Sequence, residues 1–297
     1  MIRKTAADFD PEVLRWFDRY VHGDVDRRGF LNGVARYAVG GVTAAMLLES
    51  LSPRFAQAQQ VKPEDSRISA RYVEYASSEG SGKVRGYLAR PAGGGGKLPG
   101  ILVVHENRGL NPHIEDIARR LALDNFVAFA PDALFSLGGY PGDEDKAREL
   151  FGKLDTAKVQ ADFLAAAQLL KTQAGTNGRV GAVGFCFGGG VVNWLATQWP
   201  DLNAGVPFYG VAPRLDDVPR IRAPLMLHFA GNDQRVDATW PPYEAALKAA
   251  GARFEAFVYP GVEHGFNNDT TPRYDAKAAG LAWQRTLAFF AQHLRAA

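Results

Sequence analysis

One short segment of the chain combines a reactive side chain with the small residues that a tight turn requires. Residues 184–188 read Gly-Phe-Cys-Phe-Gly, and Cys186 is the single cysteine of the sequence. A nucleophile flanked by bulky and then small residues, between a strand and a helix, is typical of a nucleophile elbow. The N-terminus of the following helix favours a thiolate, so this segment predicts nucleophilic catalysis by sulfur.

A sulfur nucleophile needs a base, and two later loops offer a base and its partner. His264 lies between two glycines after the predicted strand at 254–259, and Asp233 follows the predicted strand at 224–229. In hydrolases with such an elbow, the order along the chain is nucleophile, acid, histidine. We predict that His264 is the general base and that Asp233 orients it, with Asp237 as the rival carboxylate.

The loop after the predicted strand at 100–105 supplies further candidates. Glu106 follows that strand directly and is either a catalytic carboxylate beside the nucleophile or a solvated side chain at a strand end. In the hydrolase fold this loop gives one backbone N–H to the oxyanion hole, and the residue after the nucleophile gives the other. We therefore predict that Asn107 and Phe187 donate to the substrate oxygen.

The elements that must position these residues follow a simple alternation. Strands are predicted over 71–76, 84–90, 100–105, 127–130, 179–185, 204–209, 224–229 and 254–259, and helices over 114–123, 157–170, 187–198 and 276–294. This alternation predicts a three-layer α/β-hydrolase fold, a mostly parallel sheet with helices on both faces. The connection between residues 209 and 224 is too short for a large lid, so we expect a fairly open pocket.

The first 58 residues have the composition of an export signal. Arg27 and Arg28 precede Phe-Leu, an uncharged stretch covers 37–48, and Ala-Gln-Ala at 56–58 resembles a cleavage site. This order predicts a twin-arginine-type leader over 1–58. The alternative is a surface amphipathic helix with an accidental arginine pair. The predicted domain organisation is a leader at 1–58, a linker at 59–68 and an α/β-hydrolase domain at 69–297.

A short amphipathic helix is predicted inside this leader. Asp10 resembles an N-cap followed by proline at the first helical position, and apolar residues recur at helical spacing from Val13 to Val21. Four roles are open for this helix. It is simply part of the leader, it docks a partner, it packs on the enzyme domain, or it pairs two chains. Export by the twin-arginine machinery predicts a periplasmic or secreted protein, and retention of the leader a cytoplasmic one.

Composition excludes several classes of function. The chain has 297 residues and a formal net charge of +2, which gives no indication of nucleic-acid binding. A single cysteine rules out an internal disulfide and a multi-cysteine zinc site. No glycine-rich loop has phosphate-binding spacing, and the group His105, Glu106, His113 and Glu115 does not match a metal motif. We predict no cofactor and no metal.

Together these motifs resemble the dienelactone hydrolase (carboxymethylenebutenolidase) family from about residue 68 to residue 295. The resemblance rests on HENRGLNPHIED at 105–116, GFCFGG at 184–189, GND at 231–233 and HGFNNDTTPRYD at 264–275. It implies a Cys-Asp-His triad of Cys186, Asp233 and His264, with Glu106 as the carboxylate that holds the resting thiol. It also implies a small ester or lactone substrate and a single domain without a cap.

The chain departs from the family pattern where the family binds a substrate carboxylate. Residues 133–136 read Ala-Leu-Phe-Ser and position 268 is asparagine, where the resemblance implies arginines. Arg108 and Arg273 are the candidate replacements, and Tyr209, at the end of a predicted strand, is a further substrate-binding candidate. The alternatives to a hydrolase are a non-catalytic ligand-binding protein on the same fold and a redox-sensing thiol protein. The oligomeric state is not predicted.

Overall fold

A mostly parallel sheet forms the centre of the chain in the computed structural model, which describes residues 4–93 and 96–295. Within these residues, eight strands lie in the order β1-β2-β4-β3-β5-β6-β7-β8. The strands are β1 (Ile68–Ser77), β2 (Gly82–Pro91), β3 (Leu98–Val104), β4 (Val127–Pro131), β5 (Thr176–Phe185), β6 (Ala204–Phe208), β7 (Leu225–Ala230) and β8 (Phe254–Tyr259). The β1–β2 and β2–β4 pairs are antiparallel and the others parallel, which confirms the predicted fold class.

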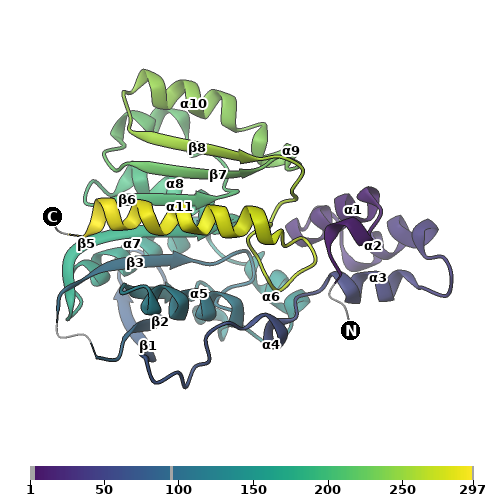
Figure 1. Ribbon diagram of the computed structural model, residues 1–297, viewed down its shortest axis with the longest axis horizontal. Coiled ribbons are helices and arrows are strands. Elements are labelled where there is room, and N and C mark those ends of the chain that lie inside the picture. The colour runs from purple at the N-terminus through teal and green to yellow at the C-terminus, as the bar shows by residue number, and fades with distance from the viewer. Residues whose placement is uncertain (1–3, 94–95, 296–297) are drawn as a thin grey trace.

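Helices cover both faces of this sheet (Figure 1). One face packs against α5 (Pro112–Leu123) and α11 (Ala276–Leu294). The other face packs against α7 (Thr156–Thr172), α8 (Phe187–Gln198) and α10 (Trp240–Ala249). The short helices α6 (Glu144–Phe151) and α9 (Gln234–Asp237) lie in loops after strands. The sequence analysis did not predict α6, α9 or α10.

Strand β3 shows why the central strands are continuous apolar runs. Ile101 and Val103 point to the core under α5 and α11, whereas Leu102 and Val104 point to the core under α7 and α8. All four side chains are fully buried, because successive side chains alternate between two covered faces. The predicted run at 100–105 therefore became an inner strand, with the polar residues after it at the carboxyl edge of the sheet.

Residues 4–58, which we call the N-terminal cap, form a small helical unit at the same edge of the sheet (Figure 1). The cap contains α1 (Pro11–His22), α2 (Arg27–Val34) and α3 (Ala44–Leu51), which pack together, and α4 (Phe55–Ala58), which lies apart from them against α5. It has its own apolar core, in which Phe30, Val34 and Leu51 are fully buried. None of the described helices is long and apolar enough to cross a membrane.

Helix α1 begins and ends as its sequence dictates. The Asp10 side chain accepts a hydrogen bond from the Glu12 N–H, and Pro11 occupies the first helical position. Gly23, with φ of 86°, ends the helix in the left-handed conformation that glycine adopts readily. The predicted amphipathic helix is thus present, and its apolar face packs inside the cap. Removal of this segment stays a prediction.

The predicted linker at 59–68 lies against the enzyme domain. The backbone N–H groups of Gln60 and Val61 donate to the Asp116 carboxylate at 3.0 and 2.8 Å. The Val61 carbonyl accepts from Arg119 Nε at 2.8 Å, and its side chain is buried. These contacts fix the path of the chain from the cap to β1.

Candidate active site

Cys186 lies in a strained turn between β5 and α8. Its φ of 56° and ψ of −114° fall outside the regions that a side chain favours, and the turn leaves the thiol partly exposed. A Cβ on Gly184 would lie 2.1 Å from the Gly188 carbonyl oxygen, and a Cβ on Gly188 would lie 2.2 Å from that of Val104. Glycine is therefore required at both places, and the turn has the backbone of a nucleophile elbow.

The structure brings His264 and Asp233 to this thiol. The imidazole Nδ1 of His264 forms a short hydrogen bond with Asp233 Oδ2, and both side chains are buried. A ring nitrogen of His264 lies within 4.8 Å of Cys186 Sγ. Asp233, rather than Asp237, is thus the carboxylate that contacts His264. The three predicted residues thus lie close together, in the chain order of an elbow nucleophile, its acid and its histidine, and their catalytic roles stay predictions.

Charges at the site favour a thiolate and an imidazolium. Burial alone would raise the pKa of the Cys186 thiol, but the positive charges of His264 and His22 lower it to about 5. Burial alone would lower the pKa of His264, but the Cys186 thiolate and the Asp233 carboxylate raise it to about 10. Near neutral pH the pair is therefore ionised, and the reactive form of the sulfur is present without substrate.

Glu106 lines the same cavity as Cys186, and its carboxylate is held by Asn268. The Asn268 Nδ2 donates to Glu106 Oε2 at 2.8 Å. Position 268 is where the family resemblance implies an arginine, so the asparagine here has a partner of its own. The backbone N–H of Phe187 begins α8 and has no acceptor within the helix. Gly188 in this end of α8 lies close to the carbonyl groups of Val104 and His105, so the loop that carries Asn107 begins beside α8. The roles of the Asn107 and Phe187 N–H groups as oxyanion donors stay predictions.

The three predicted substrate-binding side chains lie at or near the site, but the two arginines contact the cap. Arg108 Nη1 lies 3.2 Å from the Val21 carbonyl oxygen, and Arg273 Nη1 lies 3.3 Å from Asp18 Oδ1. Tyr209 is fully buried, with its ring centroid 4.9 Å from that of His264. The arginines therefore bind groups of this chain, which was not anticipated.

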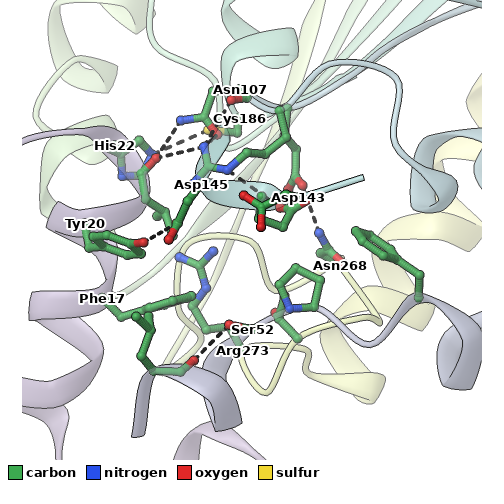
Figure 2. Close-up of a pocket in the computed structure, with 18 of the residues that line it drawn as sticks. Phe17, Tyr20, His22, Ser52, Asn107, Asp143, Asp145, Cys186, Asn268 and Arg273 are labelled. Carbon is green, nitrogen blue, oxygen red and sulfur yellow. Dashed lines mark hydrogen bonds and ion pairs between the residues drawn. The ribbon is translucent and has the colours of Figure 1, made fainter. Parts of the chain in front are cut away.

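The cavity at Cys186 has a volume of about 390 Å³ and is walled by both the cap and the enzyme domain. As expected, no large lid is inserted between β6 and β7, but the N-terminal cap adds a wall to the pocket that the sequence analysis did not anticipate. Cap residues that line the cavity are Phe17, Tyr20, Val21, His22, Arg27, Leu48, Ser52, Pro53 and Phe55. Figure 2 shows Phe17, Tyr20, His22 and Ser52 of the cap around the cavity, with His22 beside Cys186.

His22 is the site residue that the sequence analysis missed. Its Nε2 lies 3.5 Å from Cys186 Sγ, and its ring centroid lies 4.7 Å from that of His264 (Figure 2). The available signal was a histidine directly before the glycine that ends a predicted amphipathic helix. That signal gave no indication of the distant thiol, because the helix belongs to a segment with the composition of a leader.

The same three side chains are also a possible set of metal ligands, since one nitrogen of each histidine and Cys186 Sγ lie within 4.8 Å of one another. The Arg235 guanidinium lies 2.9 Å from His22 Nε2 and places a positive charge where a cation would bind, so the group does not fit a zinc ion. The group considered in the sequence has other partners: His113 Nδ1 lies 3.3 Å from Asp269, and His105 Nε2 accepts from the Ala133 N–H.

The sheet order, the strained elbow and the His–Asp pair define an α/β-hydrolase. A sequence profile of the Dienelactone hydrolase family matches residues 84–294, and the chain belongs to this family. A second profile, described as YqhI-like, matches residues 1–39, which include α1 and α2. The family makes the chain a hydrolase of esters or lactones.

Individual relatives agree with this assignment. "Protein usf" from Aquifex pyrophilus is 37% identical over 231 residues, which cover 71% of this chain and 94% of the relative. "Putative carboxymethylenebutenolidase" from Escherichia coli K12 is 34% identical over 221 residues, which cover 70% of this chain and 82% of the relative. The crystal structure of "Putative Dienelactone Hydrolase" from Klebsiella pneumoniae has a TM-score of 0.67 and 32% identity, and the match covers 75% of this chain and 99% of that one.

Proposed function

We propose that this chain hydrolyses a small, dienelactone-like ester or lactone through an acyl-thioester on Cys186. The observation that carries the proposal is the placement of one strained, partly exposed thiol beside an imidazole whose far nitrogen is bonded to a buried carboxylate. This arrangement supplies an ionised nucleophile, an acid–base group and a group that orients it. A cavity of about 390 Å³ suits a small substrate.

In the first half of the reaction the thiolate attacks the carbonyl carbon of the substrate. A carbon–sulfur bond forms, and the negative charge moves to the carbonyl oxygen, which the N–H groups of Asn107 and Phe187 stabilise. The carbon–oxygen bond to the leaving group then breaks. The His264 imidazolium gives its Nε2 proton to the departing alkoxide, and an acyl-thioester and a neutral alcohol result.

In the second half a water molecule attacks the thioester carbonyl. His264 Nε2, now neutral, takes a proton from this water, and Asp233 stabilises the imidazolium that forms. The carbon–sulfur bond breaks, the carboxylic acid leaves and the thiolate returns. Glu106 borders the cavity, and we propose that its negative charge, fixed by Asn268, helps to expel the carboxylate product.

The acyl-thioester is the direct test of this proposal. We expect rapid acid quenching during turnover of a small aryl ester to leave a protein mass increased by one acyl group. Peptide mapping should place the group on Cys186, which is the chain's single cysteine. Turnover without any acylated protein, or with the acyl group on another side chain, would contradict the mechanism. The urea-unfolded protein is the control for non-enzymatic acylation of the cysteine. It should acquire the mass of the acyl group only slowly.

The dependence of kcat/KM on pH is expected to form a broad plateau. Activity should rise as the pH increases through about 5, where the Cys186 thiol loses its proton. It should fall as the pH increases through about 10, where the His264 imidazolium loses the proton that the leaving group needs. Both limits are apparent values of the coupled pair. The measurement is hydrolysis of a small aryl ester with the spontaneous rate subtracted; a single rise near the ordinary pKa of cysteine, about 8.5, would contradict it.

A further inference from the structure

The catalytic thiol faces a second imidazole, which comes from the N-terminal cap. His22 is the last residue of α1, and its Nε2 lies 3.5 Å from Cys186 Sγ. The His22 side chain is 11% exposed, so the contact lies inside the site and not on the surface. The cap therefore places a titratable group on the reacting atom itself.

The His22 ring is held in one orientation by its own helix. Nδ1 lies 2.8 Å from the Asp18 carbonyl oxygen and 3.3 Å from Asp18 Oδ1. A carbonyl oxygen only accepts, so Nδ1 carries the proton and Nε2 presents its lone pair. The guanidinium of Arg235, which only donates, lies 2.9 Å from Nε2 and competes with the thiol for this lone pair, so it must turn aside when Nε2 takes a proton. A lone pair within reach of a thiol is the arrangement of a base.

Asp18 gives His22 the carboxylate partner that Asp233 gives His264. The Asp18 carboxylate is fixed from the enzyme domain by Arg273 Nη1 at 3.3 Å. Burial alone would lower the pKa of His22, but the Cys186 thiolate and the hydrogen bond with Asp18 raise it. Two imidazole–carboxylate pairs thus converge on one sulfur, one from the cap and one from the domain.

The end of α1 is anchored by the loop that forms the oxyanion hole. Asn107 Nδ2 donates to the Val21 carbonyl oxygen at 2.7 Å, and Arg148 Nη1 donates to that of Tyr20 at 2.8 Å. The last carbonyl groups of a helix have no partner within the helix and need such donors. The C-terminal end of a helix dipole is negative and therefore favours a cation such as Arg148. Arg27 of α2 adds an ion pair with Asp145 at 3.0 Å. These bonds set the position of His22 relative to the sulfur.

The cap leaves room for a substrate. With α1 in place, the cavity of about 390 Å³ still has Cys186 and His264 among its lining residues. Tyr20 and His22 form part of the opposite wall. A segment that only blocked the site would fill the space over the nucleophile, whereas this one encloses it.

We infer that the N-terminal cap is a working part of the enzyme and that His22 is a second base for the Cys186 thiol, beside His264. In the resting enzyme His264 already carries a proton on both ring nitrogens, so when the sulfur–hydrogen bond breaks the proton moves to His22 Nε2 and the electron pair stays on sulfur. This deepens the proposed function and rests on it, because Cys186 must be the nucleophile. Charged and titratable groups that face the thiol and His22 are Asp18, Glu106, Arg108, Tyr209, Asp233, Arg235, His264 and Arg273.

The test is the rate of Cys186 alkylation by iodoacetamide as a function of pH, in the full-length chain and its His22→Asn variant. Asparagine keeps a donor for the Asp18 carbonyl and removes the atom that faces the sulfur. We expect the midpoint of the variant to move upward by at least about 1 pH unit, which slows alkylation about tenfold at pH 4, below both midpoints, and about twofold at pH 6. The matched control is His293→Asn on α11, whose backbone carbonyl contacts Arg179 far from the site, and it should keep the wild-type midpoint.

Three results would overturn the inference. One is an unchanged alkylation profile in a folded His22→Asn variant, checked by circular dichroism. Another is faster alkylation and faster ester hydrolysis in that variant, which would mean that the cap blocks access to Cys186. The third is an intact mass of active enzyme, purified from its own cells, that lacks residues 1–58. Alkylation by iodoacetamide measures the fraction of thiolate and requires no ester. A failure of the His22 inference is therefore distinguishable from a failure of the proposed Cys186-dependent hydrolysis.

Discussion

Replacing Cys186 with alanine is expected to lower kcat/KM for a small aryl ester by a factor of about 10⁴ or more. The change removes the atom that forms the acyl bond, and the oxyanion donors that remain stabilise charge without supplying a nucleophile. The fold should be retained, because an alanine Cβ fits wherever a cysteine Cβ does. Steady-state hydrolysis and thermal unfolding of the same preparation give both results.

The Cys186→Ser variant is the matched control for this prediction. Serine keeps the φ of 56° and nearly the same volume, so the strain of the elbow is the same in both proteins. Its hydroxyl does not ionise near neutral pH, whereas the two imidazoles, against the effect of burial, lower the pKa of the thiol to about 5. We expect a loss of at least about 10²-fold. Unchanged turnover in either variant would exclude Cys186 as the nucleophile.

The wild-type protein distinguishes the two remaining functions. A non-catalytic binding protein would turn over no ester or lactone, although a ligand would still raise its melting temperature. A redox-sensing thiol protein would show Cys186 oxidised by mild peroxide with no hydrolysis that depends on it.

Replacing Asp233 with asparagine is expected to lower kcat by about 10³- to 10⁴-fold. The carboxylate accepts from His264 Nδ1 and fixes the proton on that nitrogen. An asparagine amide that donates to Nδ1 would favour the other tautomer, in which Nε2 carries the proton in the neutral ring. His264 could then no longer take a proton from water in the second half-reaction. Burst kinetics should show an acyl-enzyme that accumulates before a slow second phase.

Asp237→Asn tests whether this effect is specific. Asp237 lies in α9, four residues after Asp233, and was the rival carboxylate in the sequence. Burial and the Asp233 charge raise its pKa to about 6, and it does not contact His264 Nδ1 as Asp233 does. We expect a change in kcat of less than about threefold. A larger loss in Asp237→Asn than in Asp233→Asn would reverse the assignment.

The core of the enzyme domain could be predicted because its signals are local. Continuous apolar runs such as 100–104 indicate strands covered on both faces, and each chemical residue follows one of those runs directly. Carboxyl ends of parallel strands share one edge of the sheet, so Cys186, Asp233 and Glu106 had to lie there together. Helix α6 escaped prediction because its eight residues are mostly polar and Ala147 alone among them is buried, and α10 because it begins with Trp-Pro-Pro and shows little periodicity.

By itself the sequence determined the enzyme domain: an α/β sheet, an elbow with sulfur at its tip, and a histidine and a carboxylate in the order that an α/β-hydrolase uses. Only the tertiary structure decided what covers that site. His22 reaches the thiol across 164 residues, and Arg108 and Arg273 bind the cap. No local pattern encodes such contacts, because they depend on how a folded helical unit docks on distant loops through a few polar bonds. A segment with the composition of a leader thus became a wall of the active site.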